Sequence, residues 1–163
     1  MSQIAKVAVN GSNITEAIKS GHVTYSIENY VEEYCIAYDE NGACIDYDGG
    51  YWQSGGSGST GAKITGTIVA QNSKLKVGGK NVAVIGDQTN EVWEADPPIP
   101  SSDSSTRYTA TSSTSGSGQG TITGGNNKNA KLNGQLIAAV GSEVTTCLGS
   151  TTTIADGENS MNM

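Results

Sequence analysis

The residues with the most chemistry available are one histidine and three cysteines. These are His22, Cys35, Cys44 and Cys147. Imidazole nitrogens and thiolates are ligands that zinc takes in structural sites, and iron accepts the same donors. These four residues together would make a Cys₃His set and are therefore candidate ligands for one zinc or iron ion. The nine-residue step between Cys35 and Cys44 is far wider than that of a zinc knuckle, so a bound metal and no metal both stay open.

The cysteines also raise the question of a disulfide. An odd count in a chain without a signal peptide argues against a disulfide framework and favours small buried or surface thiols. Cys35 and Cys44 flank the Asn41-Gly42 turn signal asymmetrically. A bridge between them would need a β-bulge.

Other catalytic arrangements are scarce. The sequence has no Gly-x-Ser-x-Gly elbow and no phosphate-binding glycine loop, and one histidine leaves one candidate base for a triad. Asp39, Glu40, Asp46 and Asp48 gather around one turn, where a glycosidase pair would be conceivable. Solvated turn carboxylates are the favoured interpretation, so a hydrolase is the weakest hypothesis and we predict no enzyme.

Composition and charge exclude further classes of fold and function. Hydrophobic residues make up 35% of the chain, phenylalanine is absent and 22 residues are glycine. This is below the ~45–50% of ordinary globular domains and suits short strands around a thin interior. A net charge of −7 argues against nucleic acid and against anionic lipid. No signal-peptide core or membrane-length apolar run appears, so we predict synthesis in the cytoplasm without export by a signal peptide.

The hydrophobic pattern predicts an almost all-β chain in three parts. Residues 1–53 form a tyrosine-rich β block, residues 54–61 a Gly/Ser linker, and residues 62–163 a repeat region with a loop insertion at about 90–120. In the first block we expect a strand into the Asn10-Gly11 turn, one helical turn at 15–21, and a hairpin around Asn41-Gly42. Trp52 and Trp93 are expected in loops, capping the thin core.

Two segments repeat each other without a gap. Residues 76–87 read KVGGKNVAVIGD and residues 131–142 read KLNGQLIAAVGS. Each copy is a strand, a glycine turn, a second apolar strand and a closing glycine. A repeated β-hairpin indicates a quasi-symmetric structure rather than a catalytic pocket.

The repeat resembles the unit of PAAR and PAAR-like proteins, the spike tips of type VI secretion systems, contractile phage tails and tailocins. The family unit reads Asn-Gly-Lys, Pro-Ala-Ala-Arg, Val-Gly-Asp; residues 78–87 read GGK, NVAV, IGD. The resemblance covers roughly residues 62–89 and 118–157, without the Pro-Ala-Ala-Arg tetrapeptide itself. Cys147 lies where the family places a metal-ligating cysteine, and His22 is similar to an N-terminal histidine ligand.

The resemblance implies a small all-β cone with pseudo-threefold symmetry, here with an N-terminal β-rich extension. Two facets are recognised and a third is not yet identified. Such a cone would cap a trimeric β-helical spike, one copy per trimer, within a phage tail or injection particle that punctures a target cell envelope. No nucleic acid or small-molecule substrate is implied. The alternative is an extracellular β-rich binding module, of the carbohydrate-binding or adhesin kind.

Overall fold

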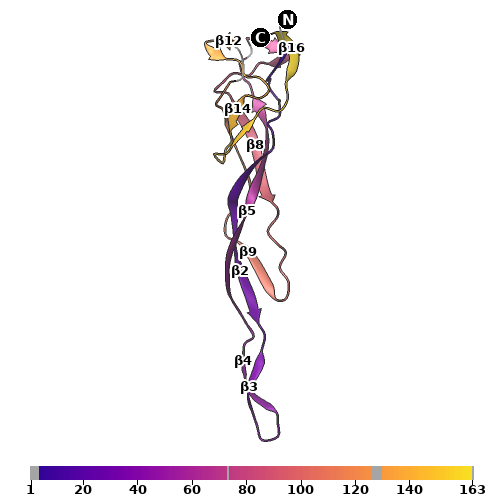
Figure 1. The fold of residues 1–163 in the computed structure, drawn as a ribbon, viewed down its shortest axis with the longest axis vertical. Coiled ribbons are helices and arrows are strands. Elements are labelled where there is room, and N and C mark those ends of the chain that lie inside the picture. The colour runs from indigo at the N-terminus through magenta and orange to yellow at the C-terminus, as the bar shows by residue number, and fades with distance from the viewer. Residues whose placement is uncertain (1–3, 73, 126–129, 163) are drawn as a thin grey trace. The chain divides into compact units, whose positions relative to one another are not determined.

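A computed structural model describes residues 4–72, 74–125 and 130–162, and these residues form strands and turns without a helix (Figure 1). None of them therefore belongs to a helix long and apolar enough to cross a membrane. The all-β prediction is confirmed. The strands are β1 Ile4–Val7, β2 Ala17–Val31, β3 Tyr34–Tyr38, β4 Cys44–Asp48, β5 Tyr51–Val69, β6 Lys76–Val77, β7 Lys80–Asn81, β8 Gln88–Asp96, β9 Thr106–Ala110, β10 Ser115–Gly118, β11 Thr121–Ile122, β12 Lys131–Leu132, β13 Gln135–Leu136, β14 Glu143–Thr145, β15 Thr151–Thr153 and β16 Glu158–Asn162.

The chain divides into two compact units, which differ from the predicted parts. Unit 1 comprises residues 1–20, 62–94 and 115–163, and unit 2 comprises residues 21–61 and 95–114. The predicted helical turn at 15–21 is wrong. The backbone N–H of Ile14 donates to Gly66 and that of Thr15 to Thr153, so this segment is already committed to neighbouring strands.

The predicted Gly/Ser linker at 54–61 is also wrong, because β5 runs through it without a break beside β2. The glycines make room for side chains of the neighbouring strand. A Cβ at Gly55 would lie 2.4 Å from Asn29 Nδ2, and one at Gly58 would lie 2.6 Å from the Tyr25 ring. A composition typical of flexible connectors here serves close cross-strand packing.

In unit 1 both predicted repeats form the expected hairpins, β6–β7 and β12–β13. Their two turn residues have positive φ in each copy, 63° and 79° at Gly78 and Gly79, and 53° and 79° at Asn133 and Gly134. This is the type I′ pattern, whose twist matches the flanking strands.

The missing third facet lies near the N-terminus. Residues 7–12 read VAVNGS, which is similar to VAVIGD at residues 82–87. Three central alanines close a ring of backbone hydrogen bonds. Ala83 donates to Ala8 at 2.9 Å, Ala8 donates to Ala138 at 3.0 Å, and Ala138 donates to Ala83 at 2.9 Å. Three segments joined head to tail in this way form a pseudo-threefold arrangement, as the resemblance implied.

The turn that follows each alanine repeats the symmetry. In each copy the backbone N–H of the turn glycine donates to the carbonyl of an isoleucine at 2.9 Å. The N–H of the same isoleucine donates back to the carbonyl of the residue that follows the glycine. The three sets are Gly11, Ser12 and Ile68; Gly86, Asp87 and Ile122; and Gly141, Ser142 and Ile154. The symmetry therefore extends from the axis to the strands packed around it.

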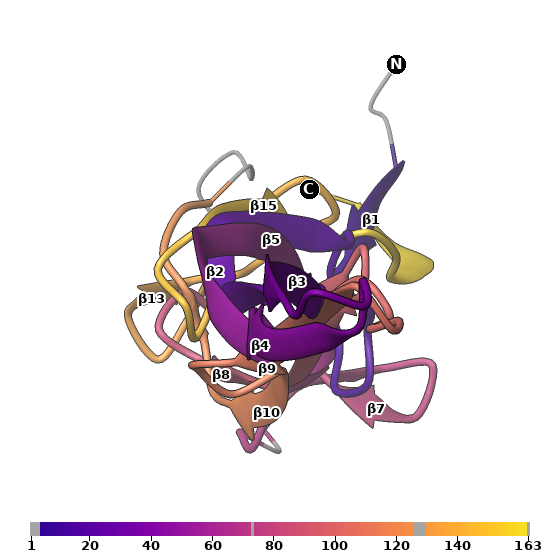
Figure 2. The same cartoon turned by 90° about the horizontal axis from the view of Figure 1, so that it is seen from below.

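The third hairpin is assembled from the two ends of the chain. β1 pairs antiparallel with β16, where Ala5 faces Met161. Figure 2 shows the strands labelled β7, β13 and β1 on three sides of unit 1. The C-terminal strand thus closes the ring that the N-terminal strand begins.

Alternating side chains of the three facets build two apolar layers on opposite sides of the ring. One layer gathers the central alanines with the three isoleucines of the outer strands, and its members are Ala8, Ala83, Ala138, Ile68, Ile122, Ile154, Ile14, Val144 and Ala70. The other, the valine layer, consists of Val7, Val9, Val77, Val82, Val84 and Ile137. Small residues suffice because three thin facets meet at one axis.

Unit 2 contains the outer parts of β2 and β5, with β9 paired to β2 and the predicted β3–β4 hairpin. The predicted loop at 90–120 is correct only in part. Residues 97–105, which begin at a cis Asp96–Pro97 bond, form no strand, but β8, β9 and β10 occupy much of the rest.

Trp93 of unit 1 lies in β8, not in a loop, and is 9% exposed. Its ring covers Gly116 of the paired strand β10, where a Cβ would lie 2.7 Å away.

Candidate functional site

The symmetric end of unit 1 that carries the three hairpins is the first candidate site, and we call it the hairpin end. Its valine layer is covered by Leu75, Ala130 and Leu132, all only partly buried. The valine layer itself is buried, so these three covering side chains are the apolar groups that remain partly open to solvent above it.

The hairpin end is also basic. Five exposed lysines lie on its segments, namely Lys6, Lys74, Lys76, Lys80 and Lys131. Lys80 forms an exposed ion pair with Glu158, with 3.5 Å between Nζ and Oε1. Three hairpins that carry exposed lysines suit a threefold partner with an acidic rim.

The turns behind the valine layer are fixed by one repeated side-chain contact. The backbone N–H at the first position of each turn donates to the side chain three residues later: Val9 to Ser12 Oγ at 3.0 Å, Val84 to Asp87 Oδ2 at 2.9 Å and Ala139 to Ser142 Oγ at 2.9 Å. Half-burial raises the pKa of the Asp87 carboxyl, and its hydrogen bond to Val84 opposes the shift. These contacts leave no buried N–H of the turns unpaired at this position.

The structure separates the four candidate metal ligands. Cys35 and Cys44 form a disulfide in unit 2, so neither sulfur is available as a thiolate ligand in this form. The expectation against a disulfide is wrong for this pair, and the bulge that the spacing required is present as register shifts on both sides of Ala37. His22 is half-buried in unit 2, whereas Cys147 belongs to unit 1.

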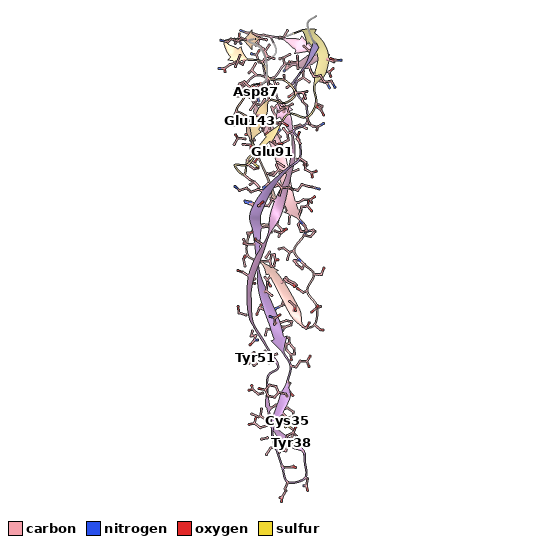
Figure 3. The ribbon with its side chains drawn as sticks, in the orientation of Figure 1. Cys35, Tyr38, Tyr51, Asp87, Glu91 and Glu143 are labelled. Carbon is pink, nitrogen blue, oxygen red and sulfur yellow. A yellow bond between two sulfur atoms is a disulfide. The ribbon has the colours of Figure 1, made fainter. Side chains whose placement is uncertain are left out.

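Cys147 lies beside a buried polar cluster whose central residue, Glu91, was not singled out from the sequence. Glu91 is labelled in Figure 3. Glu91 is 2% exposed, accepts a hydrogen bond from the Cys147 N–H at 2.7 Å, and accepts another from the Thr89 hydroxyl. Thr89 in turn accepts from the Gly120 N–H at 2.9 Å. Burial, together with the Glu91 carboxylate, raises the pKa of the Cys147 thiol to about 11.

This environment does not fit a zinc or iron shell. A structural zinc or iron site needs three or four such ligands close together. Across residues 4–72, 74–125 and 130–162 no three His, Cys, Asp or Glu side chains are placed to hold a metal ion together.

The acidic turn residues of the hydrolase hypothesis have structural contacts. Asp39 Oδ1 accepts from the backbone N–H of Asn41 at 2.8 Å and of Ala43 at 2.9 Å, which closes the hairpin turn. Asp48 accepts from the Tyr34 hydroxyl at 3.3 Å, and its charge raises the pKa of that tyrosine. These roles agree with the interpretation as turn carboxylates.

The second tryptophan, Trp52, also lies in a strand, β5, and not in a loop. The Arg107 guanidinium lies 4.5 Å from its ring centroid, and the Tyr30 ring packs at 5.3 Å. Arg107 also donates to both carboxylate oxygens of Glu28, at 3.2 and 3.0 Å. This partly exposed cluster adds side-chain contacts to unit 2, where glycine-rich strands provide little apolar area.

No protein-family model, curated protein or solved structure matches this chain.

Proposed function

We propose that this chain is a PAAR-like spike tip that caps a trimeric β-helical spike of a contractile phage tail, tailocin or related injection machine. The observation that carries the proposal is the ring of hydrogen bonds among Ala8, Ala83 and Ala138. One chain with pseudo-threefold symmetry can present three similar surfaces to a threefold partner. One copy per trimer then satisfies all three contacts.

The hairpin end is the docking face in this proposal. Its three two-stranded ribbons offer strand edges that a trimeric β-structure can extend, which also protects those edges from wrong pairing. The lysine rim adds electrostatic steering toward an acidic spike end. The role is mechanical, so it calls for rigidity in the ring and for no catalytic group.

The proposal includes assembly in the cytoplasm into a particle that later meets a target cell envelope. A disulfide persists in oxidising surroundings, so we expect Cys35–Cys44 to form once the particle is outside a reducing cytosol. A metal ion is not needed to hold the tip, because isoleucine and alanine side chains fill the axial layer.

Co-expression with the trimeric spike of the same particle tests the proposal. We expect the two proteins to co-purify, and native mass spectrometry to give one copy of this chain per three spike subunits. Lys80→Glu combined with Lys131→Glu should weaken the complex at low salt, whereas the control Lys63→Glu, outside the hairpin end, should not. A three-to-three complex, or no complex, contradicts the proposal.

A second candidate, an extracellular binding module, is favoured by one observation. Tyr34, Tyr38 and Tyr47 are exposed on a disulfide-bonded hairpin. Tyrosines at a surface serve carbohydrate and protein recognition alike. Glycan-array binding by a chain that ignores trimeric spikes would favour this candidate.

A further inference from the structure

The β3–β4 hairpin of unit 2, residues 34–48, carries an unusual concentration of exposed apolar side chains. Among the described residues, nine large hydrophobic side chains are exposed, and seven of them lie between Tyr30 and Tyr51. Tyr38 and Ile45 are 65% and 64% exposed. Scattered apolar residues need no explanation, but a local cluster of this kind marks a contact surface.

The exposure follows from the strand geometry. Along β3, Tyr34, Ile36 and Tyr38 are exposed while Cys35 and Ala37 are half-buried. Strand alternation accounts for this pattern only as far as Cys35, because register shifts on both sides of Ala37 interrupt it, so Ile36 and Tyr38 are exposed at a bulge. Figure 3 shows Cys35 and Tyr38 on this hairpin. The exposed apolar side chains thus lie on a bulged but paired hairpin and not in an irregular loop.

The hairpin is also held in one conformation before any partner binds. The disulfide joins its two strands, and the Asp39 carboxylate closes its turn with two backbone hydrogen bonds. A surface that is already ordered loses little conformational entropy on association. Rigid tyrosines add contact area at low entropic expense.

Charge decides which partner this surface suits. Residues 30–51 contain six Asp and Glu and no Lys or Arg. The acidic side chains are Glu32, Glu33, Asp39, Glu40, Asp46 and Asp48. Anionic lipid and nucleic acid would be repelled, whereas a surface rimmed with lysine and arginine would be attracted.

We propose that the β3–β4 hairpin docks onto a protein surface with an apolar centre and a basic rim. Tyr38 and Ile45 fill the centre, and the carboxylates of Asp46 and Asp48 meet the rim. Buried tyrosines surrounded by polar contacts are typical of binding hot spots. This surface is distinct from the hairpin end, so this proposal and the spike-capping proposal can fail independently of each other.

A random dodecapeptide library displayed on phage and selected on the immobilised full-length chain tests this docking. We expect enriched peptides that combine Lys or Arg with apolar residues. Tyr38→Ser and Ile45→Ser should each weaken their binding about tenfold or more, and Asp46→Asn should weaken it and reduce its salt dependence. Val92→Ser is the matched control, because Val92 is 58% exposed but belongs to unit 1.

Several outcomes would overturn the proposal. Peptides without basic residues, or peptides that bind the Tyr38→Ser and Ile45→Ser variants as well as the parent, would do so. Dimerisation of the parent chain in sedimentation experiments, abolished by Ile45→Ser, would also overturn it, because a second copy would then be the partner. Binding to phosphatidylcholine vesicles that is lost in the Tyr38→Ser and Ile45→Ser variants would overturn it as well. Circular dichroism and a free-thiol assay check that each variant folds and keeps its disulfide.

Discussion

The backbone N–H of Ala83 donates to the carbonyl of Ala8 at 2.9 Å, and this bond joins the first internal repeat to the N-terminal one. Both residues are fully buried, as is Ala138, which completes the ring. The backbones of three facets therefore meet where the smallest chiral side chain stands. Three backbone hydrogen bonds of ordinary length therefore join the facets at the axis of unit 1.

Ala83→Leu tests the packing at this axis. The three methyl groups leave no room for extra carbons, so we expect a loss of unfolding free energy of about 1–3 kcal/mol. Urea denaturation measures it. Ala110→Leu, at the exposed last residue of β9, is the control and should change stability by less than about 0.5 kcal/mol. Equal effects of the two substitutions would contradict close axial packing.

Three glycine substitutions test the symmetry itself. Gly11, Gly86 and Gly141 have φ of 89°, 100° and 94°, and a Cβ at Gly11 or Gly86 would meet no atom within 4 Å. Each Gly→Ala change should therefore destabilise by roughly 1–3 kcal/mol through backbone strain alone, and by similar amounts at the three sites.

The control for this series is Gly125→Ala, at an exposed glycine without positive φ, where a Cβ makes ordinary contact at 3.5 Å from Ile85. It should be close to neutral in the same thermal unfolding assay. A series in which one of the three turn glycines tolerates alanine would show that its turn is not equivalent to the others.

Arg107→Lys tests the cluster in unit 2. Lysine keeps the charge but loses the two-pronged contact with Glu28 and the guanidinium contact with the Trp52 ring. Both ion-pair side chains are partly exposed, so screening limits the expected loss to about 0.5–1 kcal/mol. Tryptophan fluorescence during urea unfolding measures it.

Lys63→Arg serves as the comparison for Arg107, since the Lys63–Glu94 pair is long at 3.9 Å and exposed. It should leave the unfolding midpoint unchanged. If Arg107→Lys also leaves the unfolding midpoint unchanged, the cluster contributes nothing measurable to the stability of unit 2.

The raised pKa of the Cys147 thiol predicts that the free energy of unfolding depends on pH. Its pKa of about 11 lies above that of an unfolded cysteine, so the folded state holds the proton more tightly. The associated stability is fully present below the unfolded pKa and is lost as the pH rises through about 11. Alkylation by iodoacetamide at pH 8 should be slow in the native chain and fast in urea.

Glu91→Gln removes the carboxylate beside this thiol while keeping its shape. Native alkylation of Cys147 should then become faster at a given pH, because the charge that opposes the thiolate is gone. An unchanged rate would mean that burial alone sets the reactivity.

Much of unit 1 was predictable from local signals. The glycine turns and apolar strands of residues 76–87 and 131–142 fold as their pattern indicates, because type I′ turns depend on nearby residues. The third facet also left a signal, since residues 7–9 and 82–84 both read VAV. Three residues are too short a match to identify a repeat without the ring that joins them.

Other features depend on partners distant in sequence. The pairing of β1 with β16 joins the two ends of the chain, and no local pattern predicts it. The glycines of β5 are typical of a linker until Tyr25 and Asn29 are seen packed over them. Glu91 was missed because it is one acidic residue in an alternating strand, and only its contacts with Cys147 and Thr89 distinguish it.

The most direct test of the central claim is a cryo-EM map of this chain bound to its trimeric spike, reconstructed without imposed symmetry. We predict one copy at the spike end, with the hairpin end against the spike and the spike's threefold axis passing between Ala8, Ala83 and Ala138. Three copies per spike, or a single copy attached with that alanine axis away from the spike axis, would contradict the account.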